Sequence, residues 1–229
     1  MVEIKNTKVY GLNESIIRSG YPMRDGDPES LDSLKQLNEK DLKRGFKLGQ
    51  VDSGTGHDNF LKGIVVQFDV KYPEYWTPQF QRYSFADIIS SQSKMHRLTK
   101  MKIEDSCNKY VDSVVIQNLD FWINMYNEWS LDRVFIPLSK REAYFFVENN
   151  SDINISGSYL TKYEVFMKII SNTPLGFEKW MGITTNYLQL KTIYSQRKSH
   201  KLKEDWGYFC DWIEKLPLFK TLVLSDKNA

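Results

Sequence analysis

The chain has 229 residues, which is enough for one large domain or two small ones with a sizeable buried core. Its 41% hydrophobic and 26% charged residues are typical of a globular protein, and a net charge of +2 argues against a protein that mainly coats nucleic acid. The two cysteines, Cys107 and Cys210, lie far apart without metal-ligand spacing, so we expect no metal site and no disulfide framework.

Nothing in the sequence predicts a targeting or membrane segment. The first residues, MVEIKNTK, lack the apolar core of a signal peptide, and runs such as Ile64 to Val66 are far too short to cross a bilayer. We therefore expect a soluble cytoplasmic protein without a membrane partner. Aromatic residues reach 14%, while alanine occurs only at Ala86, Ala143 and Ala229. This bias is typical of a low-GC genome and suggests a low-GC bacterium or a virus as the source. If the protein is viral, the expected location is the host cytoplasm.

Apolar periodicity predicts a mixture of strands and helices. Strands are expected over 2–10, 63–72, 133–138 and 174–185, and helices over 14–19, 28–46 with a break near Asn38, 108–128, 158–170, 186–200 and 202–213. Asn13, Asp27 and Ser158 are expected to cap the helices that follow them. Because these elements do not alternate as regular βαβ units, the sequence favours an α+β fold, with a mixed or antiparallel sheet and packed helices.

A glycine-rich turn precedes the strand that begins at Ile64. Five of the twelve glycines fall between Gly45 and Gly63, and the turn ends in Gly-His57-Asp-Asn59. It lacks the Lys-Ser/Thr pair of a Walker loop, and the chain has no GxGxxG motif. From the residues alone, His57 and Asn59 belong either to a binding loop or to a simple surface turn.

Gln79 and Arg82 follow the same strand in an aromatic segment, QFQRYS. A guanidinium offers a planar fork of donors that suits a phosphate group. The next residue, Tyr83, can donate a hydrogen bond or stack on a ring, but it cannot neutralise charge.

The segment SSQSKMHR, which ends at Arg97, gathers neutral and cationic hydrogen-bond donors. Ser91, Ser93 and Arg97 together could cradle an anion. A solvated polar segment is an equally good interpretation of these residues.

Asn186 opens a predicted helix, and Arg197 lies eleven residues later on the same side, three turns along. Held in that way, the two side chains could grip a planar, anionic ligand. Arg197 could instead be a helix-end cation that the helix dipole favours. With Lys198, His200 and nearby lysines it could also form a nucleic-acid patch, which the small net charge disfavours.

These blocks, in this order, resemble the flavin-dependent thymidylate synthases. GHDNFLKGIVVQFDVK is similar to the family's GHxTPFEH segment and the strand after it, QFQRYS to its RHR motif, and the stretch from Pro174 to Arg197 to its C-terminal signature. The chain is a divergent member by this resemblance: Tyr83 and Ser84 replace a His and an Arg, while Leu188 and Thr192 replace an Arg and an Asn. The resemblance implies one domain over 1–229, with a variable middle segment of about 100–172.

The resemblance also implies an activity, the reductive methylation of dUMP to dTMP. The carbon would come from methylenetetrahydrofolate and the reducing equivalents from NADPH through FAD. The family assembles as a homotetramer with sites between subunits. The implied roles are catalysis for Arg197; substrate binding for Gln79, Arg82, Ser91, Ser93 and Arg97; and cofactor binding for His57, Asn59, Arg82, Tyr83 and Asn186.

Two alternatives stay open on the same scaffold. One is a catalytically degenerate nucleotide-binding or regulatory protein, which the replacements at Leu188 and Thr192 favour. The other is a related enzyme that modifies a different pyrimidine nucleotide. In each reading, Arg82 and Arg197 are expected to converge on one phosphorylated pyrimidine.

Overall fold

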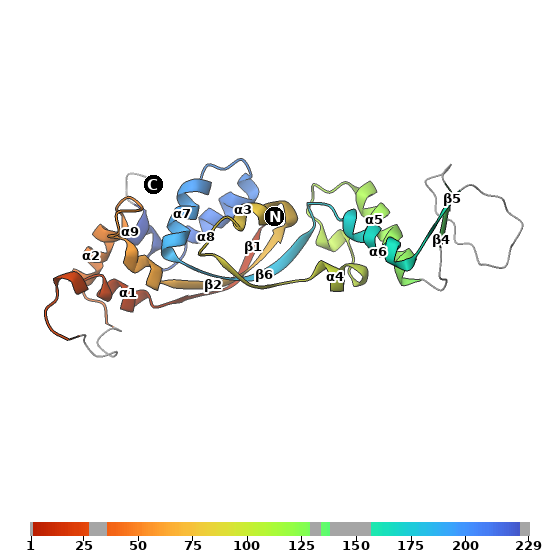
Figure 1. The fold of residues 1–229 in the computed structure, drawn as a ribbon. Helices are drawn as coiled ribbons and strands as arrows, with labels where there is room; N and C mark the ends of the chain where they lie inside the picture. The colour runs from red at the N-terminus through yellow and green to blue at the C-terminus, as the bar shows by residue number, and fades with distance from the viewer. Residues whose placement is uncertain (1, 28–35, 129–133, 138–156, 225–229) are drawn as a thin grey trace, which may run out of the picture. The chain divides into compact units, whose positions relative to one another are not determined.

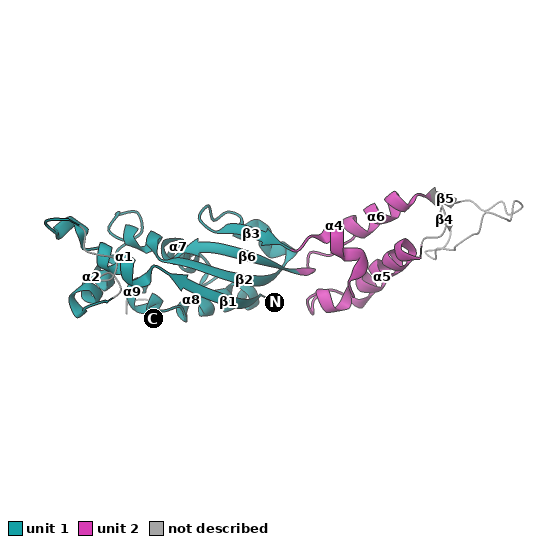
Figure 2. Ribbon diagram, turned by 90° about the horizontal axis from the view of Figure 1, so that it is seen from below, with its two compact units in different colours: residues 1–91, 179–229 teal, residues 92–178 magenta. Residues whose placement is uncertain are grey.

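The computed structural model describes residues 2–27, 36–128, 134–137 and 157–224 (Figure 1). Parts of the predicted helix over 28–46 and of the predicted strand over 133–138 lie outside these ranges, as does the whole segment from 138 to 156. The chain forms two compact units, Met1–Ser91 with Lys179–Ala229 (unit 1) and Gln92–Glu178 (unit 2), coloured teal and magenta in Figure 2. Unit 2 contains the segment 100–172 that the sequence sets apart, and the single domain over 1–229 stays a prediction.

Unit 1 is built on a four-stranded sheet in the order β1-β2-β6-β3. Its strands are β1 (Glu3–Tyr10), β2 (Val65–Pro73), β3 (Asp87–Ser91) and β6 (Glu178–Asn186). β1 runs antiparallel to β2, with Val9 opposite Val66, and β3 runs antiparallel to β6, with Ile88 opposite Ile183. This arrangement confirms the predicted α+β class with an antiparallel sheet.

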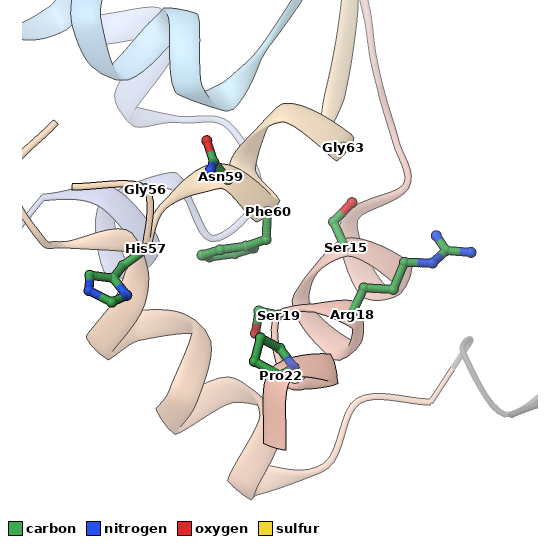
Figure 3. A pocket seen from close by; sticks show the side chains of 9 residues that line it. All are labelled: Ser15, Arg18, Ser19, Pro22, Gly56, His57, Asn59, Phe60 and Gly63. Carbon is green, nitrogen blue, oxygen red and sulfur yellow. The ribbon is translucent and has the colours of Figure 1, made fainter. Parts of the chain in front are cut away.

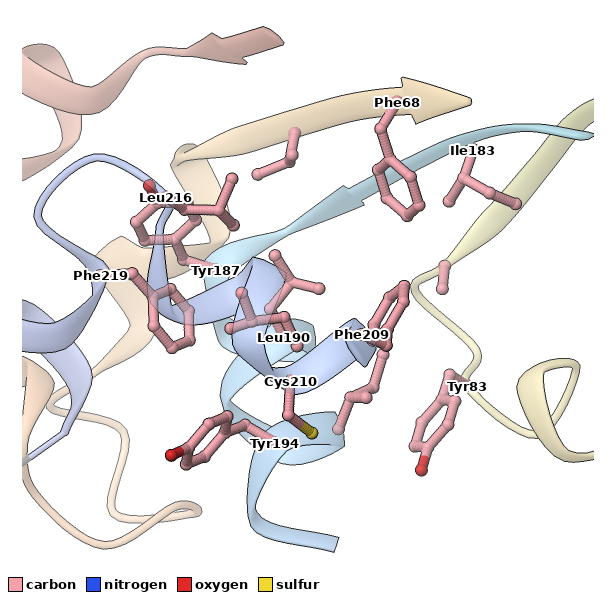
Figure 4. Packing of buried hydrophobic residues seen from close by; sticks show 14 of the residues in the cluster. Phe68, Tyr83, Ile183, Tyr187, Leu190, Tyr194, Phe209, Cys210, Leu216 and Phe219 are labelled. Carbon is pink, nitrogen blue, oxygen red and sulfur yellow. The ribbon is translucent and has the colours of Figure 1, made fainter. Parts of the chain in front are cut away.

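One face of the sheet carries the main core. Val66, Phe68, Val70 and Tyr72 alternate along β2 and are buried, whereas Gln67 between them is exposed. Helices pack on the buried face, as Figure 4 shows for side chains of α7 (Tyr187–Arg197), α8 (Tyr208–Glu214) and α9 (Phe219–Val223). Apolar burial of this extent is the main force that holds the helices on the sheet.

Unit 1 contains further helices besides α7, α8 and α9. They are α1 (Leu12–Arg18), η1 (Tyr21–Met23), α2 (Glu39–Gly49), η3 (Asn59–Gly63), η4 (Glu74–Trp76), α3 (Thr77–Phe80) and the π-helical turn η7 (Lys203–Gly207). Asn38 caps α2 by accepting a hydrogen bond from the Asp41 backbone N–H at 2.8 Å, which agrees with the predicted break there.

Unit 2 has its own smaller core. Its elements are α4 (Lys94–Arg97), η5 (Leu98–Lys100), η6 (Glu104–Ser106), α5 (Ser113–Asn127), β4 (Val134–Pro137), β5 (Gly157–Leu160) and α6 (Lys162–Ser171). Leu119 and Ile123 of α5 are buried in one cluster with Val165 and Ile169 of α6, and β4 pairs antiparallel with β5.

Several predicted element ends were wrong, each for a local reason. Ser158 lies within β5 and does not cap a helix, because Thr161 and Glu164 form a complete capping box at the start of α6. α1 begins at Leu12 after Gly11 rather than after Asn13. Gly11 has φ 69°, and a Cβ there would lie 2.6 Å from the Gly63 carbonyl oxygen, so this close turn requires glycine.

Three further elements begin later than predicted. α5 begins at Ser113 rather than 108, because the Asn108 N–H bonds to the Gly176 carbonyl at 2.9 Å instead of starting a helix. β6 begins at Glu178, since Pro174 and Phe177 close a turn. The last predicted helix is a π-helical turn followed by α8, and it includes residues up to Glu214.

Candidate functional site

α7 is the element that organises the site, and its ends fall where the sequence predicts. Asn186 is its N-cap: the side-chain oxygen accepts a hydrogen bond from the Gln189 backbone N–H at 2.9 Å. Arg197 is its last residue. Because a helix rises about 1.5 Å per residue, the two side chains are separated by roughly 16 Å along the axis. Asn186 and Arg197 therefore stand at opposite ends of α7, and the oxygen of Asn186 is already used by the cap.

The guanidinium of Arg197 is held by side chains from three segments of unit 1. Its Nε donates to the Tyr83 hydroxyl at 2.6 Å, and one terminal nitrogen lies 3.5 Å from Oε1 of Gln79. Its central carbon lies 4.6 Å from the ring centre of Trp206, within the range of a cation–π contact. Trp206 also donates its indole N–H to the same Gln79 oxygen at 3.0 Å.

Tyr83 anchors this cluster as a neutral phenol. It is only 6% exposed, and burial raises its pKa despite the opposing hydrogen bond and charge of Arg197. Its hydroxyl accepts from Arg197 and lies 3.2 Å from the Gln196 side-chain oxygen, to which it can donate. The predicted contact of Tyr83 with a cofactor stays a prediction, and in the structure its hydroxyl accepts a hydrogen bond from Arg197.

The positive charge of Arg197 is not neutralised within the part of the chain that the structure describes. No carboxylate there forms an ion pair with it, and its hydrogen-bond partners are a phenol and an amide. Two further cations, Arg82 and Lys201, act electrostatically on Tyr83 and His200 of the same region. The cluster thus presents a fixed cation and an amide N–H₂ group, that of Gln79, beside a buried aromatic surface, which suits a planar anionic ligand.

Arg82 itself does not enter this contact network. Its side chain is exposed and makes no hydrogen bond or ion pair with another described residue. The residue that meets Arg197 is the adjacent Tyr83. Arg82 remains close enough to lower the Tyr83 pKa by its charge, against the stronger effect of burial.

The predicted anion cradle is divided between the two units. Ser91 is exposed at the end of β3 in unit 1. Ser93 and Arg97 belong to unit 2, where Ser93 directly precedes α4 without capping it through its side chain and Arg97 is exposed. Their joint action on one ligand stays a prediction.

His57 and Asn59 line a different feature, a pocket of about 430 Å³ in unit 1. Figure 3 shows side chains of α1 on one side of it and those of the 56–60 segment, including Phe60, on the other. His57 and Asn59 are exposed, and their side chains make no hydrogen bond with other residues in the described ranges. The complete set of lining residues is Ser15, Arg18, Ser19, Pro22, Gly56, His57, Asn59, Phe60 and Gly63.

Three contributors were not foreseen as site residues. Trp206 lies on the apolar face of the last predicted helix, so the sequence predicts only that it is buried. Its cation–π contact with Arg197 depends on the fold. Gln196 precedes Arg197 and has no distinct signal. Lys191 of α7 binds the glycine-rich loop through Asp58, a contact across 133 residues that no local pattern reveals.

Within the described residues, no group of three or more His, Cys, Asp or Glu side chains could hold a metal ion. No helix there is both long enough and apolar enough to span a bilayer.

The sequence matches no protein-family model and no curated protein. Its fold, however, matches solved structures over nearly the whole chain. One is flavin-dependent thymidylate synthase ThyX from Helicobacter pylori, complexed with FAD and dUMP, with 14% identity, 98% of both chains covered and a TM-score of 0.58. Another is Thymidylate Synthase X from the same organism with FAD and dUMP, with 14% identity, 98% of this chain and 97% of that chain covered and a TM-score of 0.59. The chain therefore has the fold of the solved flavin-dependent thymidylate synthases.

Proposed function

We propose that this protein binds a pyrimidine nucleotide and methylates dUMP to dTMP, with Arg197 as the catalytic residue. The observation that carries the proposal is the state of Arg197. Its guanidinium is fixed by Tyr83 and Trp206, yet no carboxylate among the described residues neutralises it. A fixed cation without a carboxylate partner is a binding group for an anion.

The chemistry of the uracil edge fits these donors. That edge presents two carbonyl oxygens on either side of an N–H, and activation of the ring carbon as the nucleophile for methylation places negative charge on one of the oxygens or on the nitrogen. The remaining N–H groups of Arg197 and the amide N–H₂ of Gln79 can donate to it. Because Trp206 is fully buried and Tyr83 nearly so, one side of the site is shielded from water, which strengthens this stabilisation.

The pocket lined by His57 and Asn59 would hold the ring system of FAD rather than the whole cofactor. The two side chains have unused hydrogen-bonding groups, Phe60 offers an apolar ring, and a volume of about 430 Å³ suits a ring system rather than a whole dinucleotide. Asn186 could contribute its remaining amide hydrogens, and Arg82 and Tyr83 complete the proposed cofactor residues. When bound, FAD supplies the reductive chemistry that side chains lack. NADPH and methylenetetrahydrofolate are the proposed sources of electrons and carbon.

The remaining parts of the proposal follow from the resemblance in sequence and fold. Arg82, Ser91, Ser93 and Arg97 would bind the nucleotide phosphate, from the same protomer or from a neighbour in a homotetramer. The protein would act in the cytoplasm.

A second candidate is a nucleotide-binding protein that no longer uses flavin. The observation in its favour lies on α7, where the Thr192 hydroxyl bonds to the Leu188 carbonyl at 3.3 Å. The Leu188 side chain has no hydrogen-bond donor, and the Thr192 hydroxyl already donates to a carbonyl of the same helix. In the family pattern these two positions are an Arg and an Asn, which can donate to a cofactor.

Two measurements separate these candidates. The first is the visible absorbance of the purified protein with added FAD, and its bleaching by NADPH under anaerobic conditions. The second is the shift in melting temperature with dUMP, dCMP or dTMP, since a ligand that binds only the folded state raises stability. Flavin uptake together with a dUMP shift supports the enzyme, whereas a nucleotide shift without flavin uptake supports the second candidate.

The role of Arg197 is tested with Arg197→Gln and, as a matched control, Lys198→Gln at the next position. We expect the first to abolish the dUMP shift and the second to keep it. A protein that binds neither FAD nor any pyrimidine nucleotide, or an Arg197→Gln variant that binds dUMP as the wild type does, would overturn the proposal.

A further inference from the structure

Lys191 of α7 has the most completely partnered ammonium group near the site. Its Nζ donates to the Gly49 carbonyl at 2.9 Å, to the Val51 carbonyl at 2.5 Å and to Oδ2 of Asp58 at 2.7 Å. These three acceptors use all three ammonium hydrogens. The Lys191 side chain is 11% exposed and that of Asp58 only 2%, so the ion pair is largely shielded from water.

These contacts close both ends of one loop. Gly49 is the last residue of α2, Val51 begins the connection to η3, and Asp58 ends it. A lysine that binds the final carbonyls of a helix also satisfies groups that have no partner within the helix. Gln50 adds a hydrogen bond to the Thr221 carbonyl at 2.9 Å, so the start of the loop is held from two directions.

The middle of the loop is held by far less. Gly54 and Gly56 have φ values of 96° and 82°, and an added Cβ would meet no atom within 4 Å at Gly54 and only the Asn59 amide at Gly56. Thr55 bonds only to the Asp52 carbonyl three residues earlier. Segments with few contacts of their own open locally at low cost in free energy, so the ends determine where this loop lies.

The loop matters because it forms one wall of the pocket. His57 and Asn59 flank Asp58 directly, and both line the pocket together with Phe60. On the opposite wall, α1 is fixed against η3 by the close approach of Gly11 and Gly63. Asn59 and Phe60 belong to η3, which contacts both α1 and α7, whereas the loop that contains His57 is tied to α7 through Asp58 and Lys191.

We propose that Lys191 and Asp58 are positioning residues, which hold the 50–58 loop so that His57 and Asn59 face the pocket ligand. Lys191 precedes Arg197 by six residues on α7, so the same helix fixes the pocket wall near its middle and presents Arg197 at its C-terminal end. The identity of the pocket ligand as FAD rests on the proposed function, whereas the tie itself rests only on the contacts above.

The test uses the double variant Lys191→Met/Asp58→Asn, which leaves no lone buried charge and is therefore expected to fold. The matched control is Lys62→Met, an exposed lysine in η3 that forms no hydrogen bond or ion pair with other residues of the described ranges. Lys191→Arg keeps the charge and serves as the conservative variant. Three quantities are measured in each protein: amide hydrogen exchange over 50–58, affinity for FAD, and the melting-temperature shift with dUMP.

We expect the double variant to exchange the 50–58 amides faster and to bind FAD more weakly, each by about tenfold or more, since hydrogen bonds to a charged group are worth factors of that order. The dUMP shift should stay unchanged, because Tyr83, Gln79 and Trp206 still hold Arg197. Lys62→Met should match the wild type, and Lys191→Arg should recover part of the loss.

Unchanged exchange over 50–58 in the double variant would overturn the proposal, as would faster exchange with wild-type affinity for FAD. A wild-type protein that takes up no FAD would instead count against the proposed flavin function, and hydrogen exchange would then decide by itself whether Lys191 and Asp58 hold the loop.

Discussion

The two cations on the inner side of α7 differ in one respect, which is how far the protein neutralises them. Lys191 meets a buried carboxylate and two carbonyl oxygens, while Arg197 meets a phenol, an amide and an indole ring. Both are fixed in place, but only Arg197 keeps its charge available to a ligand. The comparison indicates that the role of a buried or half-buried cation depends on its partners rather than on its position along the helix. A cation with a carboxylate partner holds other parts of the protein in place, whereas a cation without one can bind an anionic ligand.

The largest expected effect is the loss of stability in Lys191→Met. In Lys191→Met the Asp58 carboxylate stays buried without its partner, and removal of one member of a buried ion pair costs about 3–5 kcal/mol. We expect the free energy of unfolding, measured by urea denaturation, to fall by about that amount. Lys62→Met should change it by less than about 0.5 kcal/mol. A Lys191→Met protein as stable as the wild type would remove the contrast between the two cations.

A smaller loss is expected at the anchor of Arg197. Tyr83→Phe deletes the hydroxyl that accepts from Arg197 Nε, a bond to a charged group worth about 1.5 kcal/mol. Urea denaturation should report a loss of that order, and dUMP should bind more weakly because the guanidinium is no longer fixed. Tyr208→Phe is the control, since Tyr208 is exposed in α8 and bonds to no other described residue. Equal dUMP affinity in Tyr83→Phe and wild type would show that Tyr83 does not orient Arg197.

Loss of Arg197 itself should alter stability much less than loss of Lys191. Arg197→Gln removes the hydrogen bond to Tyr83 and a cation–π contact of a half-buried side chain, so the free energy of unfolding should fall by about 1.5 kcal/mol. Urea denaturation measures this directly. A stability loss as large as that of Lys191→Met would mean that Arg197 is a structural residue and would weaken its proposed role in catalysis.

The features that depend on neighbouring residues could be predicted from the sequence, whereas the contacts between distant segments could not. Asn186 and Arg197 mark the ends of α7 because caps and helix ends depend on nearby residues. Which of two adjacent side chains faces inward at a turn depends on the whole fold, so the sequence favoured Arg82 where the structure places Tyr83 against Arg197.

The same limit explains the residues that were missed. Lys191 and Asp58 are 133 positions apart, and each by itself has the sequence signature of an ordinary surface charge. Lys191 does lie four residues after the buried Tyr187, on the inner side of α7, which is the one signal that could have drawn attention to it. Trp206 was placed correctly in the core, but only the fold brings it under the guanidinium.

The smallest expected effect is on His200, and it tests most directly whether Arg197 remains charged and unpaired. The His200 ring lies 6.2 Å from that of Trp206, and its Nδ1 accepts a hydrogen bond from the Leu202 N–H at 3.1 Å. Burial and then the charges of Arg197 and Lys201 lower the His200 pKa below its ordinary value. As pH falls, the unfolded chain therefore takes up this proton first, and acidification slightly lowers stability.

Removal of Arg197 should move that pKa. In Arg197→Gln, NMR titration should place the His200 pKa closer to its ordinary value, because one of two nearby like charges is gone. The control is Lys191→Met/Asp58→Asn, which removes a neutralised pair from the other half of the helix and should leave the His200 pKa where it is. If Arg197→Gln left the pKa unmoved, a partner would be neutralising the guanidinium in solution, and the difference between the two cations of α7 would disappear.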